Sequence, residues 1–236
     1  MLRIGFVTLF PEMVLSAIRH GVLRRGEAAG CLSFESSNPR DFATDPHRTV
    51  DGKPCGGGPG MVLRPDLVQQ AIDAIRGEDA EVVLTDPTGE RFTQSVAQEL
   101  CRSTQVIFVC GHYEGIDDRI RQKSVTRCLS IGDFVLTGGE LAALVIADAT
   151  CRLVKGVLGD EASHTTDSHT FGGLLGYPQY TLPREWQGLE VPEVLLSGDH
   201  GAIERWRRAQ ALAVTRARRP DLFAQAKLHK KDLDLL

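Results

Sequence analysis

The stretch SIGDFVLTGGE, Ser130–Glu140, joins the two patterns that decide the fold. A strand pattern ends at Ser130-Ile131, and an apolar helical pattern runs from Glu140 to Val154. Between them, glycines flank the three apolar residues Phe134–Leu136. Glycine loses the most backbone freedom on folding, so it is retained where the chain must turn sharply or approach another group closely. The stretch therefore predicts a strand, a tight loop and a helix, and it leaves open what the loop encloses.

Strand-like and helix-like patterns alternate around this stretch, through the first 156 residues. Buried strands are predicted at residues 3–9, 32–35, 81–85 and 105–111, and a further strand ends at residue 131. Helices are predicted at residues 11–25, 66–75, 93–101 and 140–154. Such alternation is typical of an α/β domain with a mainly parallel sheet.

Three loops that combine glycine with polar residues follow predicted strands: Asp86–Gly89, Gly111–Gly115 and the stretch Ser130–Glu140 itself. Ligands of parallel sheets bind at the carboxyl ends of the strands. Backbone N–H and C=O groups in such loops can hydrogen-bond the edge of a purine. The nearby acidic pair Asp117-Asp118 is more simply a helix N-cap. These loops lack the spacing of metal ligands, so the residues themselves predict no metal site.

A fourth glycine-rich segment, Gly56–Gly60, lies within HRTVDGKPCGGGPGMVL (His47–Leu63). It suits a backbone that approaches a ligand or another chain closely, and a flexible surface loop stays open as the alternative. The segment lacks the G-x-x-x-x-G-K-[ST] arrangement of a P-loop. It also lacks the strand-then-helix context of a dinucleotide-binding fingerprint, which disfavours a dehydrogenase.

Composition restricts the class of protein. The chain has 236 residues, of which 42% are hydrophobic and 25% charged, as in soluble globular proteins. Aromatic residues make up 6%, which argues against a wide stacking platform for single-stranded nucleic acid. The six cysteines form no C-x-x-C pair, and they indicate reduced core thiols in a cytoplasmic protein. No signal peptide or membrane span is expected, because the apolar N-terminal stretch is cut by Pro11-Glu12 and residues 141–154 are too few.

The C-terminal part differs in charge. Residues 200–236 carry nine Lys or Arg and four Asp or Glu residues, so their net charge is +5 and that of the remainder −9, within a total of −4. A helix is predicted at residues 200–219, capped by Ser197 or Asp199 and ended by Pro220. Four of its arginines lie within an arc of about 80°, opposite an expected packed face. Such a stripe suits phosphate contacts, with a solvated helix face as the alternative. The stripe consists of Arg205, Arg208, Arg216 and Arg219, and the expected packed face of Ile203, Trp206, Ala213, Val214 and Ala217.

Six motifs, in order along the chain, resemble those of one family. They are LFPEM (Leu9–Met13), NPRDF (Asn38–Phe42), HRTVDGKPCGGGPGM (His47–Met61), CGHYEGID (Cys110–Asp117), SIGDFVLTGGE and GVLGDEASHTTDS (Gly156–Ser168), followed by a tail VLLSGDH…WRR…RRPDL. They resemble the bacterial tRNA (guanine-N1)-methyltransferases, the TrmD family of SPOUT-type enzymes. The resemblance implies a deep trefoil knot in an α/β domain at residues 1–158, a flexible linker at 159–172 and a small helical tRNA-contacting domain at 173–236.

The resemblance also implies an activity. A methyl group passes from S-adenosylmethionine to N1 of the guanosine immediately 3′ of a tRNA anticodon, in a homodimer whose subunits share the active site. Asp167 matches the family's general base, Arg152 its guanidinium partner, and Glu114 the carboxylate nearest to a Mg2+ ion that the family is reported to use. From the residues alone, Asp167 would be a turn residue and Arg152 a helix-dipole partner. The implied cofactor pocket consists of Pro87, Gly89, Gly111, Tyr113, Ile131, Gly132, Asp133, Phe134, Val135, Leu136 and Gly138.

The sequence departs from the family pattern at four positions. Asp86 stands where the loop usually begins with serine, and His112 where arginine is frequent. Gly176 and Leu182 replace residues that concern the tRNA contact. Two other functions stay open. Another SPOUT RNA methyltransferase, acting on a ribose 2′-hydroxyl or on rRNA, would lack the Asp167 segment, and a non-catalytic RNA-binding protein would need the arginine stripe alone.

Overall fold

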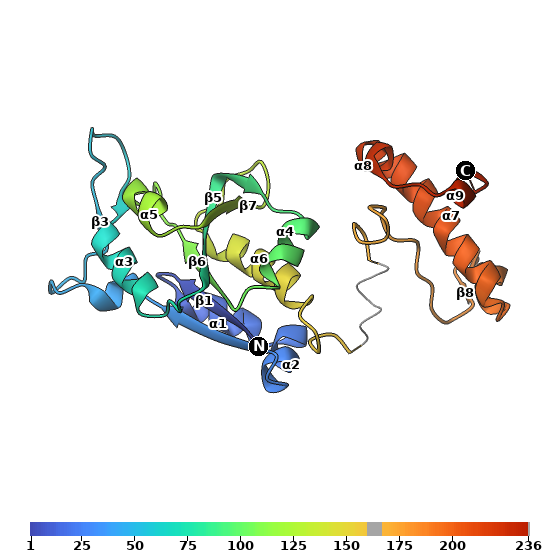
Figure 1. Ribbon diagram of the computed structural model, residues 1–236, viewed down its shortest axis with the longest axis horizontal. Helices are drawn as coiled ribbons and strands as arrows, with labels where there is room; N and C mark the ends of the chain where they lie inside the picture. Colours follow the sequence, from blue (N-terminus) through green and yellow to red (C-terminus); the bar gives the residue numbers. More distant parts are fainter. Residues whose placement is uncertain (160–166, 236) are drawn as a thin grey trace. The chain divides into compact units, whose positions relative to one another are not determined.

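The computed structural model describes residues 1–159 and 167–235 (Figure 1). It divides into two compact units, Met1–Gly159 and Asp160–Leu236, and each is described by itself. The first part of the predicted linker, residues 160–166, lies outside the described residues. Within the described part of the chain, no helix is long and apolar enough to cross a membrane.

A five-stranded sheet forms the centre of the first unit. Its order is β2-β1-β6-β5-β7, and all neighbouring strands are parallel, which confirms the predicted mainly parallel α/β fold. The central strand is buried at all six residues, as expected for a parallel strand covered on both faces. The strands are β1 (Leu2–Val7), β2 (Leu32–Ser37), β5 (Ala80–Arg91), β6 (Gln105–Cys110) and β7 (Arg127–Ser130).

Helices cover both faces of this sheet (Figure 1). One face packs against α1 (Pro11–Ile18), α2 (Gly21–Ala28), α4 (Gln94–Leu100) and α6 (Glu140–Cys151). The other face packs against α3 (Pro65–Asp73) and α5 (Asp118–Lys123). The remaining elements are a 3-10 turn, η1 (Pro39–Phe42), and a short antiparallel ladder of β3 (Asp51–Gly52) with β4 (Val62–Leu63).

Two predicted segments differ from the structure, and the predicted cap at Asp117 is confirmed. The helix expected at residues 11–25 is two helices. The first ends at Ile18, and the second begins at Gly21, whose φ is +63°. The segment Asp86–Gly89 is not a loop after a strand, since β5 continues through it with a register shift between Thr85 and Glu90. Asp117 caps α5, and its carboxylate accepts a hydrogen bond from the backbone N–H of Arg119.

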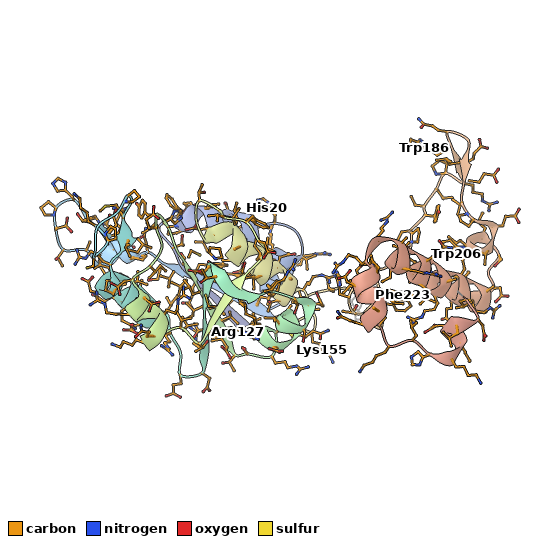
Figure 2. All side chains as sticks on the ribbon, turned by 90° about the horizontal axis from the view of Figure 1, so that it is seen from above. His20, Arg127, Lys155, Trp186, Trp206 and Phe223 are labelled. Carbon is orange, nitrogen blue, oxygen red and sulfur yellow. The ribbon has the colours of Figure 1, made fainter. Side chains whose placement is uncertain are left out.

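The second unit is built around one long helix, α7 (His200–Arg218), which Asp199 caps by accepting from the backbone N–H of Ala202. Its core joins Ala211 and Leu212 of α7 to Leu174, all fully buried. Leu174 lies in a segment without periodicity, so the sequence did not predict its burial. Trp186 lies on the hairpin of β8 (Glu185–Trp186) and β9 (Leu189–Glu190), away from Trp206 on α7 (Figure 2). The other elements are η2 (Glu193–Leu196), α8 (Pro220–Gln225) and α9 (Lys230–Leu233).

The predicted faces of α7 are wrong in part, because Arg205 and Arg216 are exposed as expected whereas Arg208 is not. Arg208 lies on the packed side, with 17% of its side chain exposed, and forms a bidentate pair with the buried Asp232 at 2.8 Å for both bonds. Arg219 pairs with the neighbouring Asp221. Ala213 and Ala217, expected in the core, are exposed. The helical pattern assigned every arginine to the surface. Arg208 can lie on the packed side because the buried Asp232 carboxylate neutralises its charge.

Candidate active site

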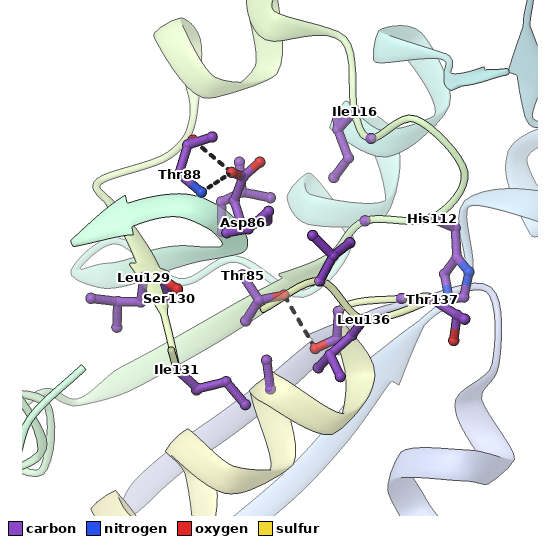
Figure 3. Close-up of a pocket in the computed structure, with 18 of the residues that line it drawn as sticks. Thr85, Asp86, Thr88, His112, Ile116, Leu129, Ser130, Ile131, Leu136 and Thr137 are labelled. Atoms are coloured by element: carbon purple, nitrogen blue, oxygen red, sulfur yellow. Dashed lines mark hydrogen bonds between the residues drawn. The ribbon is translucent and has the colours of Figure 1, made fainter. Parts of the chain in front are cut away.

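A pocket of about 320 Å³ opens at the carboxyl ends of β6 and β7 and at the irregular part of β5 (Figure 3). This volume is within the range of small-molecule sites, roughly 300–1,000 Å³. All three segments singled out in the sequence contribute to its lining. Of the expected cofactor residues, Gly89 and Asp133 are not part of the lining. Those that line it are Pro87, Gly111, Tyr113, Ile131, Gly132, Phe134, Val135, Leu136 and Gly138.

The surroundings of Gly138 and Gly139 explain why glycine precedes α6. A Cβ on Gly138 would overlap the ring of His112 and would lie 2.6 Å from Oε2 of Glu140. A Cβ on Gly139 would overlap the Thr85 hydroxyl and would lie 2.8 Å from Cα of Cys110. The loop thus passes directly over the end of β6, and the backbone N–H of Gly139 donates to the carbonyl of Gly111 at 2.9 Å. Larger residues would force this backbone out of the pocket wall.

A buried carboxylate ties three segments together beside the pocket. Glu140, the first residue of α6, accepts from the Thr8 hydroxyl at 2.6 Å and lies 2.7 Å from Nε2 of His112. An acidic residue in the first turn also interacts favourably with the helix dipole. The Cys110 thiol is buried in the core. This burial, and secondly the charge of Glu140, raises the pKa of the thiol. The network holds the loop after β6 against the start of α6.

Asp86 lines the pocket, and its carboxylate forms hydrogen bonds with Thr88 and Arg121. One carboxylate oxygen accepts from the backbone N–H and the hydroxyl of Thr88, at 2.8 and 2.6 Å (Figure 3). The other accepts from Arg121 at 3.1 Å. The departure from serine therefore stabilises the irregular part of β5 that carries Pro87, and it leaves Pro87 in the lining.

Apolar side chains stand exposed around the pocket. Phe134 and Val135 are 54% and 82% exposed, and Tyr113, with φ of +59°, is 54% exposed. Apolar surface of this kind, next to a concave site, marks a place where a ligand or another chain packs. Leu136 and Ile131 extend the apolar wall into the pocket (Figure 3).

The three expected catalytic residues lie in different places. Glu114 lines the pocket, and Arg152 forms the C-cap of α6 in the same unit. Asp167 belongs to the second unit, where its carbonyl accepts from the backbone N–H groups of Thr170 and Phe171 at 3.2 Å. Among the described residues, no three His, Cys, Asp or Glu side chains gather closely enough to hold a metal ion. The expectation of a magnesium ion therefore gains no support from the described residues.

Sequence reasoning missed three polar residues around the pocket. Thr85 is buried at the regular end of β5 and donates to the carbonyl of Gly139 at 3.2 Å or of Val109 at 3.3 Å. Glu140 and Thr8 are buried as well. The only signal in the sequence was the glycine pair directly before Glu140. It indicates that the backbone there is crowded, but it does not identify the residues that contact Glu140.

Comparison with known proteins covers both units. The family model described as tRNA (Guanine-1)-methyltransferase TrmD matches residues 2–225. A tRNA (guanine-N(1)-)-methyltransferase from Dictyoglomus turgidum is 48% identical over 236 residues, covering 100% of this chain and 96% of the relative. One from Chloroflexus aggregans is 50% identical over 242 residues, covering 100% of this chain and 94% of the relative. The match includes the pocket, α6 and the segment around Asp167.

Proposed function

The chain belongs to the tRNA (guanine-N1)-methyltransferase family, and on this premise we propose that it methylates N1 of the guanosine immediately 3′ of the anticodon. It is an S-adenosylmethionine-dependent methyltransferase that acts on tRNA. The family match over residues 2–225 is the observation that carries the proposal, since it spans the pocket and the Asp167 segment together.

The pocket suits S-adenosylmethionine, whose sulfonium supplies an electrophilic methyl group when it is bound. Ile131, Phe134 and Leu136 provide apolar walls for an adenine ring. The close passage at Gly138 brings main-chain groups to the pocket wall without side chains between them. Gly89 is better explained by strand packing, because a Cβ there would lie 2.6 Å from the backbone nitrogen of Leu129. Glu114 offers a carboxylate at the pocket to a cationic methyl donor.

Asp167 and Arg152 are proposed to prepare the target base. N1 of guanine carries a proton and is a poor nucleophile until that proton leaves. The Asp167 carboxylate takes this proton as general base, and the Arg152 guanidinium stabilises the negative charge that develops on the neighbouring oxygen.

A homodimer is proposed to complete the site, with Asp167 of one subunit acting at the pocket of the other. Met13 on α1, and Leu141 and Val145 on one face of α6, are 41%, 50% and 51% exposed. The two helices contact each other. An apolar face of this kind suits a two-fold contact with a second copy. The trefoil knot, formed where the Ser130–Glu140 stretch passes over the end of β6, is part of the same proposal.

The division into a knotted domain at 1–158, a linker at 159–172 and a tRNA-contacting domain at 173–236 is likewise proposed, as is a cytoplasmic location. Two compact units, with their boundary after Gly159, support the division. Arg205, Arg216 and Arg218 are exposed on α7 and are available to phosphates.

One assay tests the proposed function. The protein is incubated with labelled S-adenosylmethionine and unmodified tRNA that carries guanosine 3′ of the anticodon, and the methylated atom is mapped. Label at N1 of that guanosine is the expected result. Label on a ribose hydroxyl would instead indicate another SPOUT activity, and tRNA binding without transfer would indicate a non-catalytic RNA-binding protein.

A further inference from the structure

The glycine-rich run Gly56–Gly60 has no part in the function proposed above, yet its last residue lies against Glu114, which lines the pocket. A Cβ on Gly60 would lie 2.7 Å from Cδ of Glu114 and would overlap Cγ and Oε1 of the same side chain. The φ of Gly60 is +80°, in the left-handed region that favours glycine. Any larger residue at position 60 would therefore strain the backbone and displace the Glu114 carboxylate.

Hydrogen bonds join the two segments on either side of this contact. The backbone N–H of Glu114 donates to the carbonyl of Met61 at 2.9 Å, and that of Leu63 donates to the carbonyl of Gly115 at 3.0 Å. The backbone next to Gly60 is thus held against the loop that follows β6. Because the Glu114 side chain is flexible and exposed, it is the part that yields to a larger residue at position 60.

A nearby glycine provides a contrast. Gly57 has a φ of +83°, close to that of Gly60, but a Cβ on Gly57 would meet no atom within 4 Å. Both glycines have a positive φ, and only Gly60 is close to Glu114. The positive φ is a reason for glycine at both positions. The contact with the Glu114 side chain is a further reason at Gly60 alone.

We propose that Gly60 is a positioning residue, which keeps the Glu114 carboxylate in one orientation at the pocket and so supports the rate of methyl transfer. This inference rests on the proposed function, in which Glu114 faces the cationic methyl donor. Gly60 therefore affects the rate of methyl transfer only through the position of the Glu114 carboxylate. When the Glu114 side chain is removed, glycine at position 60 no longer matters for the rate.

A double-mutant cycle in the full-length protein tests this relationship, with Gly60→Ala, Glu114→Ala and their combination. Gly60→Ala is expected to lower kcat about 100-fold, the scale of a misplacement of about 1 Å in an active site. Gly57→Ala is the matched control. It also places a side chain at a positive φ, so it should lose thermal stability through backbone strain yet retain most of kcat. In the Glu114→Ala background, the change at Gly60 should alter kcat little further.

Three results would overturn the positioning role: wild-type kcat in Gly60→Ala, an equal loss with and without the Glu114 side chain, or full activity of Glu114→Ala. A crystal structure of Gly60→Ala adds a readout that needs no activity. A displaced Glu114 carboxylate supports the inference, and an unmoved one overturns it. If the wild-type protein methylated no tRNA, the proposed function would fail, while this crystal structure would still decide whether Gly60 sets the position of Glu114.

Discussion

The ring of His112 and the carboxylate of Glu140 form a nearly enclosed hydrogen bond, with Nε2 2.7 Å from Oε2. Their side chains are 16% and 2% exposed. The bond joins the loop after β6 to the first residue of α6, and the Thr8 hydroxyl after β1 donates to the same carboxylate. One buried group therefore fixes three segments that are far apart in the sequence, beside the pocket.

We expect His112→Ala to lower the free energy of unfolding by about 1–3 kcal/mol, because a buried acceptor loses a partner. Binding of S-adenosylmethionine should weaken as the loop after β6 loosens. Calorimetric unfolding and titration with the cofactor measure the two effects. His112→Arg is the control, since a guanidinium can donate to the same carboxylate. Equal losses in both variants would show that the shape of the imidazole matters rather than its hydrogen bond to Glu140.

The Arg208–Asp232 pair should make the second unit sensitive to acid. The hydrogen bonds from Arg208 are the main reason why the pKa of Asp232 falls from 3.8 to about 2. Since the folded pKa is depressed, the stabilisation is complete above about pH 4 and is lost as the pH falls through about 2. Its size is about 2 kcal/mol.

Arg208→Gln should therefore reduce the thermal stability of this unit at pH 7, and the difference from wild type should shrink at pH 2. Thermal unfolding between pH 2 and 7 measures both. Asp221→Asn is the comparison, because Asp221 also pairs with an arginine but lies on the surface, where such pairs contribute little. An Arg208→Gln variant as stable as wild type would contradict the buried ion pair.

The sequence predicted the sheet well because parallel strands buried on both faces are continuous apolar runs, as at residues 105–110. It also placed the pocket, since the glycine-bearing segments at the strand ends meet there. The continuation of β5 through Pro87 could not be predicted, because proline usually ends a strand and the irregular pairing with β7 permits it here.

Buried charges were the other limit. Burial of Arg208 depends on Asp232, which lies 24 residues further along the chain. Burial of Glu140 depends in the same way on Thr8 and His112. A periodic pattern contains no information on such distant partners, so it assigns every charged side chain to the surface.

Arg216→Glu should weaken tRNA binding and reduce its dependence on salt. Arg216 is exposed on α7, and each lost phosphate contact lowers the slope of log K against log salt by about 1. Binding measured at several salt concentrations gives this slope. Arg216→Lys keeps the charge and should keep the slope. If the slope of Arg216→Glu equals that of wild type, this arginine is solvated and does not contact tRNA.

Asp167→Ala should lower the rate of methyl transfer at least 100-fold, the lower range of general-base contributions, and leave the affinity for S-adenosylmethionine nearly unchanged. The reason is that Asp167 is proposed to act on the base and belongs to the second unit, whereas the residues that line the pocket belong to the first. A sharper test mixes Asp167→Ala chains with chains whose proposed cofactor pocket is inactivated by Gly139→Leu, which would overlap Thr85. In a shared site, the mixed dimer combines one intact pocket with the intact Asp167 of the other chain, so activity should return with one working site per dimer. Single-turnover assays of the mixture, beside each variant alone, measure this recovery. Failure to recover activity in verified mixed dimers would place Asp167 at the pocket of its own chain.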